Sequence, residues 1–193
     1  MNQSTIIPAN AYILIGGNSR RFGSPKWKAK VNGSRMIEHA WNICSNFKNR
    51  FIVGKSKPNE IEYSFIRDTF DIQSPINGLY SAIQETDSEW NFMLSCDLPL
   101  MSTEVINKIW TFGKHSADSI VPMVYNQPQP ISAFYNKQIK FKIIHQIKSG
   151  ELSIQSMLRS INTHYLNMNE YKKEFSNMNT KEDYSRIIQE ENK

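Results

Sequence analysis

The segment AYILIGGNSRRFGSPK, residues 11–26, decides the fold of this chain. It opens with a short apolar run that is followed at once by Gly16-Gly17, the pattern of a buried strand that ends in a tight turn. Ser34 then precedes apolar residues at helical spacing, so the sequence predicts a helix that begins near Met36 with Ser34 as its N-cap. Strand, loop and helix therefore follow in order.

The same alternation continues through most of the chain. Apolar runs predict strands at residues 51–53, 64–67, 91–95, 120–124, 131–135 and 165–168. Helical spacing predicts helices at 79–83, entered after Pro75 and Gly78, at 105–110, at two places within 137–160 and at 181–189. This alternation is typical of an α/β fold, a doubly wound, mostly parallel sheet with helices on both faces. Since no linker interrupts the pattern, residues 1–193 are predicted to form one domain.

The formal charge of +5 favours an anionic partner, such as nucleic acid, an acidic membrane or a small phosphorylated molecule. Basic residues crowd one loop region, at Arg20, Arg21, Lys26, Lys28 and Lys30. Crowding of this kind fits a local anion site better than a broad nucleic-acid face, where aromatic residues would alternate with the basic ones. We therefore expect a small phosphorylated ligand and no nucleic acid.

Neither a membrane segment nor a disulfide is expected. No apolar run approaches the roughly 20 residues that span a bilayer, and the first ten residues lack the features of a signal peptide. Cys44 and Cys96, the two cysteines, lie in segments predicted as a helix and a buried strand, so we expect reduced core thiols. These features indicate a cytoplasmic protein with no membrane partner.

Two groups with chemical potential are predicted to meet at one edge of the sheet. Ligands of open parallel sheets bind beyond the carboxyl ends of the strands, where Gly16-Gly17 and Asp97 would both lie. The glycines let backbone N–H groups approach a phosphate, and Arg21 and Lys26 would neutralise its charge. The loop matches neither the dinucleotide fingerprint nor the P-loop, and an ordinary Gly-Gly turn with solvated basic side chains is the alternative.

Asp97 follows an apolar strand and precedes Pro99, so its carboxylate is predicted to stand at the strand end, facing the cleft. A carboxylate in that place can bind Mg²⁺ together with substrate phosphates, and the alternative is an Asp that caps the next turn. Magnesium and basic side chains suit attack of one phosphate on the α-phosphate of a nucleotide, which needs no covalent nucleophile.

Four ordered stretches resemble the molybdenum cofactor guanylyltransferase family and together cover almost the whole chain. LIGGNSRRFGSPK resembles the family's opening L-A-G-G-x-S-x-R-M-G-x-x-K, and SPINGLYSAI resembles its G-P-L-x-G-L. SCDLP is similar to C-D-x-P, and FSNMNTKEDY to N-x-N-T-P-E-D-L, with Lys181 in place of proline. Of these, the C-terminal N-x-N-T is more particular than the Gly-Gly turn, which many nucleotidyltransferases share.

The resemblance implies a single Rossmann-like nucleotidyltransferase domain that transfers GMP from GTP to molybdopterin with Mg²⁺, forming the guanine dinucleotide cofactor and releasing pyrophosphate. It implies catalytic roles for Arg21, Lys26 and Asp97, with Asp97 as the metal ligand, and a molybdopterin side formed by Asn177 and Asn179. The implied nucleotide-binding residues are Leu14, Ile15, Gly16, Gly17, Lys26, Asp68, Pro75, Gly78 and Asp97. Molybdenum-insertion proteins and molybdoenzyme chaperones are the implied protein partners.

Three departures from the family pattern bear on the base that is used. Ile15 stands where the family has a small Ala, Gly54 where an Asn is common, and Pro25 precedes Lys26 as in related cytidylyltransferases. Leu98 in the C-D-x-P stretch favours GTP, because the relatives that use CTP tend to have Gln there. The alternatives are a cytidylyltransferase for molybdopterin, a sugar-phosphate nucleotidyltransferase, or a non-catalytic nucleotide-binding module, against which Lys26 and Asp97 count together.

Overall fold

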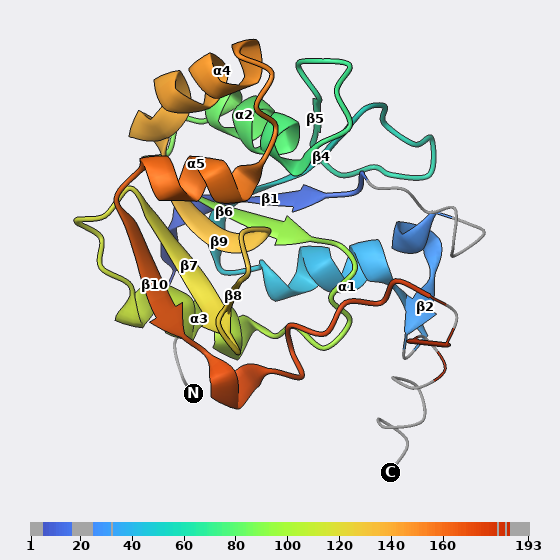
Figure 1. Ribbon diagram of the computed structural model, residues 1–193. Coiled ribbons are helices and arrows are strands. Elements are labelled where there is room, and N and C mark those ends of the chain that lie inside the picture. Colours follow the sequence, from blue (N-terminus) through green and yellow to red (C-terminus); the bar gives the residue numbers. More distant parts are fainter. Residues whose placement is uncertain (1–5, 17–24, 32, 181, 184, 186–193) are drawn as a thin grey trace.

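A mixed, mostly parallel sheet with β1 (Ile7–Leu14) at its centre forms the middle layer of the protein (Figure 1). The computed structural model describes residues 6–16, 25–31, 33–180, 182–183 and 185. From one edge to the other, the strands are β10 (Thr163–Asn167), β7 (Ser119–Val124), β9 (Ser132–Asn136), β6 (Trp90–Ser95), β1, β4 (Phe47–Gly54) and β5 (Phe65–Arg67), and β8 (Gln127–Pro128) pairs with β7. The expected α/β architecture is confirmed.

The strand order reverses beside β1. The chain moves outward from β1 to β4 and β5, and β6 then returns to the other side of β1, all in parallel. In open α/β sheets such a reversal leaves a crevice at the carboxyl ends of the strands. The fold therefore places a crevice next to the segment that follows Leu14.

One central strand, β9, runs antiparallel to both of its neighbours, β6 and β7. The chain turns back after β7 through Tyr125 and Asn126, which have φ values of +48° and +61°. Two successive residues with positive φ form the two-residue hairpin turn whose twist matches that of the strands, and Val124 pairs with Gln127 across it. The strand predicted at residues 131–135 is present, and this turn determines its direction.

The helices cover both faces of the sheet (Figure 1). One face packs against α1 (Met36–Ile43) and α3 (Thr103–Phe112), and the other against α2 (Pro75–Glu85), α4 (Lys140–Lys148) and α5 (Ile154–Ser160). β1 serves both cores because successive side chains of a strand point to opposite faces. Ala11 and Ile13 belong to the core on the α1 side, whereas Tyr12 belongs to the α2 side.

Two helix starts differ from the prediction. The N-cap of α1 is Arg35, whose backbone N–H donates to Glu38 Oε2 at 2.8 Å, because Ser34 pairs with Val31 in a small hairpin of β2 (Lys30–Val31) and β3 (Ser34–Arg35). α2 begins at Pro75 itself, so Gly78 lies inside the helix. The helix predicted at 181–189 falls largely outside the described residues. No described helix combines the length and apolar composition needed to cross a bilayer.

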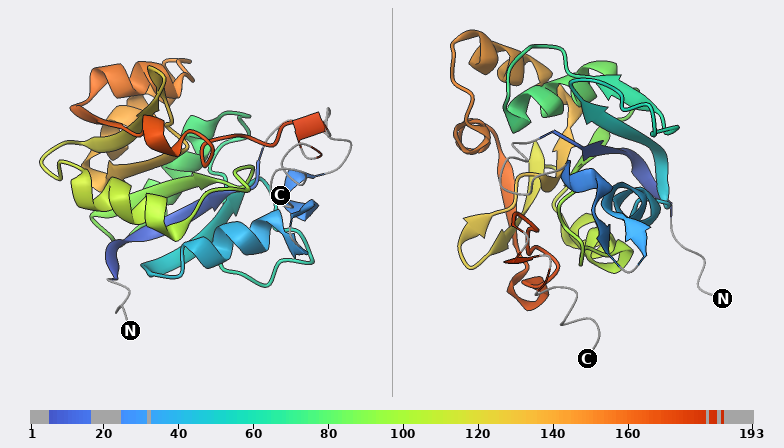
Figure 2. Two further views of the ribbon diagram at one scale, coloured as in Figure 1. Left: turned by 90° about the horizontal axis from the view of Figure 1, so that it is seen from below. Right: turned by 90° about the vertical axis from the view of Figure 1, so that its right-hand side faces the viewer.

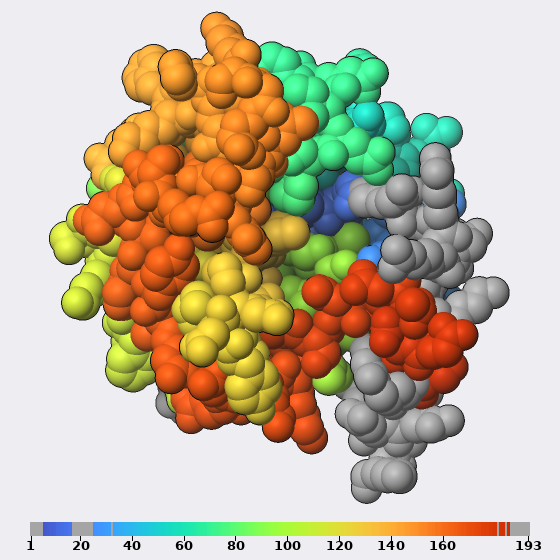
Figure 3. Space-filling model, viewed as in Figure 1, coloured from blue at the N-terminus to red at the C-terminus, as the bar shows by residue number. Residues whose placement is uncertain are grey.

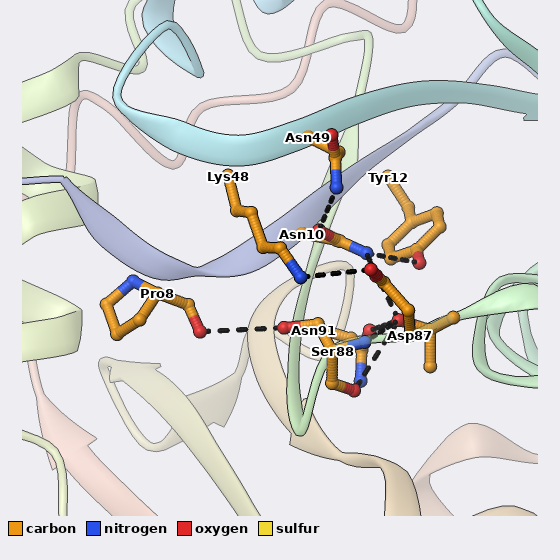
Figure 4. Close-up of polar contacts among 9 residues, drawn as sticks. Pro8, Asn10, Tyr12, Lys48, Asn49, Asp87, Ser88 and Asn91 are labelled. Atoms are coloured by element: carbon orange, nitrogen blue, oxygen red, sulfur yellow. Dashed lines mark hydrogen bonds and ion pairs between the residues drawn. The ribbon is translucent and has the colours of Figure 1, made fainter.

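A polar cluster around the buried Asn10, whose partners on other elements are partly buried or exposed, joins the elements at the amino ends of the central strands (Figure 4). Asn10, 1% exposed on β1, donates to Asp87 Oδ1 at 2.9 Å and to Thr86 Oγ1 at 3.2 Å, and it accepts from Asn49 Nδ2 at 3.1 Å. Lys48 donates to the other carboxylate oxygen of Asp87 at 2.9 Å. The cluster links β1, β4 and the turn from α2 to β6, at the end of the sheet opposite the crevice.

The chain after β10 returns across the molecule to the carboxyl ends of the central strands (Figures 1 and 2). It passes through a 3-10 turn, η4 (Asn169–Tyr171), and Met178 then packs with Val31 and Met36 in a small separate core. Two further 3-10 turns are η2 (Lys26–Lys28) and η3 (Lys137–Ile139). The return brings residues 177–180 beside the loop that begins at Pro25.

Candidate active site

A cavity of about 760 Å³ opens at the carboxyl ends of β1, β4 and β6, the position that the strand order predicts. Figure 3 shows the surface hollowed between the green atoms around α2 and the red C-terminal segment. Its volume lies within the range of small-molecule and cofactor sites. The predicted residues that line it are Leu14, Ile15, Gly16, Asp68, Pro75 and Gly78. Gly17 and Arg21 lie outside the described residues.

Lys26 joins two predicted site residues just beside this cavity. Its ammonium group lies 3.0 Å from Asp97 Oδ2 and donates to Asn179 Oδ1 at 2.5 Å. Ser95 Oγ donates to the other oxygen of Asp97, and the side chains of Lys26 and Asp97 are only 18% and 17% exposed. Asp97 and Asn179 thus meet at Lys26, although they lie 71 and 153 positions after it in the sequence. Asn177 and Asn179 are both exposed, and of the two only Asn179 bonds to Lys26.

A buried tryptophan, which the sequence reasoning did not select, positions Lys26. Lys26 opens the turn η2, and Trp27, 5% exposed, packs into the core on the α1 side. Pro25 precedes the turn with an extended backbone. Since adjacent residues of a tight turn point in different directions, the buried indole directs Lys26 toward the carboxyl ends of the strands. The sequence feature that could have indicated this anchor is a large apolar residue, Trp27, between two lysines.

The strand end and the C-terminal segment hold Asp97 from two sides. Cys96, next to it, is buried, and its backbone N–H donates to Leu14 O at 3.2 Å. The carbonyl of Asp97 accepts from Met178 N at 2.8 Å. Burial raises the pKa of the Cys96 thiol to about 12, so the thiol stays neutral and is unsuited to attack a phosphate.

The motif N-x-N-T contains a reciprocal cap. Asp183 Oδ2 accepts from the backbone N–H groups of Asn179 and Thr180, both at 3.0 Å, while Thr180 Oγ1 accepts from Asp183 N at 3.1 Å. This arrangement resembles a capping box, in which two side chains satisfy each other's backbone donors. It fixes the turn from which Asn179 reaches Lys26.

Asp68 stands on the other side of the cavity, directly after β5. Its Oδ1 is shielded from solvent and has no hydrogen-bond partner, and its backbone N–H donates to Gly54 O at 2.9 Å. Burial raises the pKa of this carboxyl above its ordinary value, while the nearby ammonium group of Lys55 lowers it. Asp68 lines the cavity, and its shielded Oδ1 would have to become accessible before a ligand could donate to it.

Gly78 lines the cavity at a point where α2 packs closely against Leu14, at the end of β1. A Cβ at this position would stand 2.6 Å from Leu14 Cδ2, so α2 approaches the end of β1 more closely than any other residue would permit. In the described part of the chain, no group of three or more His, Cys, Asp or Glu side chains could hold a metal ion. A cation at this site would have to use one carboxylate together with neutral oxygens and the phosphates of a ligand.

The sequence model of the MobA-like NTP transferase domain matches residues 11–165, which run from β1 into β10. This chain belongs to the MobA-like NTP transferase family. Membership makes it a nucleotidyltransferase.

Individual relatives agree with the family. The chain is 31% identical to a protein of Aquifex aeolicus, with 94% of this chain and 90% of that one covered, and 30% identical to one of Bacillus subtilis, with 93% and 94% covered. Both bear the name "Probable molybdenum cofactor guanylyltransferase". The crystal structure of molybdopterin-guanine dinucleotide biosynthesis protein A from Archaeoglobus fulgidus has the same fold, with a TM-score of 0.81, 22% identity, and 93% of this chain and 97% of that chain covered.

Proposed function

We propose that this family member transfers GMP from GTP to the terminal phosphate of molybdopterin, forms the guanine dinucleotide cofactor and releases pyrophosphate. The named relatives support the substrates, and the meeting of Lys26, Asp97 and Asn179 beside the cavity is the observation that carries the proposal. An oxygen of the molybdopterin phosphate would attack the α-phosphorus of GTP, and the bond to the β-phosphate would break. Since the attacking oxygen comes from the substrate, the protein needs no nucleophile of its own.

Asp68 supports guanine as the base. The Watson–Crick edge of guanine offers two adjacent donors, N1–H and N2–H, whereas cytosine offers one donor beside two acceptors. An ionised Asp68 carboxylate, which lines the cavity, would accept two adjacent N–H groups in strong charge-assisted bonds, whereas a protonated carboxyl would present an O–H donor to one of them. A cytosine edge would direct acceptors at the same carboxylate. The charge of Asp68 therefore favours GTP over CTP.

The contacts of Lys26 support a magnesium site between Asp97 and Asn179. Two oxygens from different segments converge on one ammonium ion, so the geometry already suits a positive charge. A carboxylate and an amide oxygen are ligands of the kind that Mg²⁺ prefers. Mg²⁺ bound there would neutralise phosphate charge, and Lys26 would turn to an oxygen of the α-phosphate, where negative charge increases in the transition state. Ser95 would keep the Asp97 carboxylate in its orientation.

Thermal stabilisation by GTP, CTP, ATP and UTP, each with and without Mg²⁺, tests the base and the metal together. Selective binding to the folded state raises apparent stability by mass action. We expect a shift with GTP and Mg²⁺ only, followed by pyrophosphate release when molybdopterin is added. A CTP-selective shift would indicate a cytidylyltransferase, and no shift with any nucleotide would overturn the proposal.

Asn179→Ala tests the metal site, with Asn177→Ala as the matched control from the same motif. Loss of the Asn179 oxygen should raise the Mg²⁺ concentration for half-maximal turnover by about tenfold. Asn177→Ala should leave this concentration unchanged, because of the two exposed asparagines only Asn179 contacts Lys26. If Asn179→Ala instead raised only the KM for molybdopterin, Asn179 would belong to the second substrate and not to the metal.

A further inference from the structure

A lysine and a carboxyl group continue two neighbouring strands just past their ends. β4 and β5 run in parallel and end with Gly54 paired to Arg67. The ladder continues by one more bond, because Asp68 N donates to Gly54 O at 2.9 Å. Lys55 and Asp68 therefore follow the last pair of these strands side by side, and both residues line the cavity.

Lys55 and Asp68 belong to the same side of the cavity. Val53 and Ile66, two positions before them, pack in the core on the α2 side. Since side chains two positions apart along a strand point to one face, Lys55 and Asp68 lie on the α2 side as well. The ammonium group of Lys55 lowers the pKa of Asp68, against the effect of burial. The α2 side of the cavity thus carries a cation beside a carboxyl group.

Lys55 has a partner that it can give up at little cost. Its ammonium group donates to Asp71 Oδ1 at 2.7 Å, but the side chains of Lys55 and Asp71 are 51% and 95% exposed. Exposed ion pairs contribute little to stability, because water screens the attraction and both side chains lose freedom. The ammonium group stands on a flexible stem, so a ligand in the cavity can compete with Asp71 for it.

We propose that Lys55 is a specificity-determining residue, which leaves Asp71 when the nucleotide binds and donates to the O6 atom of the base. The inference rests on the proposed use of GTP. A lysine ammonium group carries donors only, and guanine presents the acceptor O6 where adenine presents an amino group, so adenine would set donor against donor. A cation beside a carboxyl group also matches the order along guanine, where O6 is next to the donor N1–H. The ligand class is a purine nucleoside triphosphate with an oxo group at C6.

Dissociation constants of GTP, inosine triphosphate and ATP with Mg²⁺, measured by calorimetry, test this role. Lys55→Met should weaken binding of GTP and inosine triphosphate by about tenfold each, because both bases carry O6, and should change ATP binding by no more than about twofold. Lys48→Met is the matched control. Lys48 is also 51% exposed and pairs with a carboxylate, Asp87 at 2.9 Å, but it lies near the other end of β4. Its loss removes the same charge and should weaken all three nucleotides by no more than about twofold.

The outcomes separate the inference from the proposed function. If the unmodified protein binds GTP no better than ATP, both are wrong. If it prefers GTP, but Lys55→Met weakens all three nucleotides equally or no more than Lys48→Met does, only the role of Lys55 is wrong.

Asp71→Asn tests the exchange of partners. It removes the carboxylate that Lys55 leaves, so the affinity for GTP should rise by up to about fivefold. A lower affinity for GTP would mean that the pair of Lys55 and Asp71 persists in the complex, which contradicts the proposal. Both side chains are exposed, so neither Lys55→Met nor Asp71→Asn should disturb folding, and the affinity of each variant for ATP checks this.

Discussion

Lys26 makes contacts in this structure that it cannot keep during the proposed reaction. Its ammonium group neutralises Asp97 and bonds to Asn179, although the transition state of nucleotidyl transfer requires positive charge at the α-phosphate. In the proposed reaction both contacts would exchange: the oxygens of Asp97 and Asn179 would hold Mg²⁺, and Lys26 would turn to a phosphate of the nucleotide. The two carboxylates of the site thus differ in role: Asp97 already holds a cation, whereas Asp68 has an oxygen without a partner.

Asp97→Asn should therefore reduce turnover by at least about a hundredfold while changing the melting temperature little. The amide keeps the shape of the side chain but loses the charge that faces Lys26 and that would hold the proposed metal. Turnover at saturating GTP, beside a thermal melt without ligand, measures the two effects. Glu60→Gln is the control, since it removes the carboxylate from the exposed pair with Lys28 at 2.7 Å and should leave turnover intact. Full activity of Asp97→Asn would exclude the metal role.

Asp68→Asn should weaken GTP binding and at the same time stabilise the nucleotide-free protein at neutral pH. The folded state raises the pKa of Asp68 by burial, so the ionised form is less favourable in the folded than in the unfolded chain. Its unfavourable effect on stability is present at neutral pH and disappears as the pH falls through the raised pKa. The difference in free energy of unfolding between Asp68→Asn and the unmodified protein, measured by denaturant melts, should therefore become smaller as the pH is lowered.

The affinity for GTP gives the second test of Asp68. It should fall as the pH is lowered through the raised pKa, because a protonated carboxyl loses its charge-assisted bonds to the base. Asp68→Asn should show no such decrease over the same range. A parallel decrease in both proteins would assign the pH dependence to another group.

At the scale of elements, α2 does more than cover the sheet. Its buried Asn77 donates to the carbonyls of Phe70 and Ile72 at 2.7 and 3.0 Å, and accepts from Phe70 N at 3.2 Å. These bonds hold the loop that leaves Asp68. The prediction from periodicity found this helix and most strands, because apolar spacing reports burial. It could not give the antiparallel direction of β9, which depends on the turn at Tyr125-Asn126, or show that Ser34 pairs in a hairpin and does not cap α1.

The predicted site residues show the same division. Gly16 and Asp97 followed from their places at strand ends, and the family resemblance supplied Asp68. The contact between Asn179 and Lys26 could not be predicted, since it depends on the path of the chain across the molecule after β10. The anchoring role of Trp27 also depends on tertiary packing, which a lone tryptophan between lysines does not specify.

Asn77→Ala should lower the free energy of unfolding by about 2 kcal/mol, since it leaves buried backbone groups of the loop without partners. It should also speed hydrogen exchange in residues 68–73 before the rest of the sheet is affected. Denaturant melts and exchange mass spectrometry measure the two effects. Asn167→Ala is the control, because the side chain of Asn167 is exposed and accepts only from the nearby Asn169 N. Equal effects of the two changes would mean that the Asn77 bonds do not hold the loop.

The whole molecule separates stability from chemistry along the direction of its parallel strands. The carboxyl ends carry the cavity, a carboxyl oxygen without a partner and an ion pair that would rearrange in the proposed reaction. The amino ends carry the polar cluster around the buried Asn10, in which the side chains bond to one another (Figure 4). Buried polar networks that are satisfied make a core rigid, whereas functional sites tolerate unsatisfied groups.

Asn10→Ala tests this separation because it removes bonds to Asp87 and Thr86 and leaves Asn49 without its acceptor. The free energy of unfolding should fall by about 1 kcal/mol, because Asn10 is buried but Asp87 and Asn49 are exposed and can bond to water once its side chain is removed. The affinity for GTP and the turnover should stay within about twofold of the unmodified protein when both are measured well below the lowered melting temperature. The reason is that substitutions at distant, independent sites have separate effects. Asp68→Asn should do the opposite, weakening GTP binding without a loss of stability. If Asn10→Ala weakened GTP binding as strongly as Asp68→Asn, the two ends of the sheet would be coupled through β1, and the cavity would depend on the cluster for its shape.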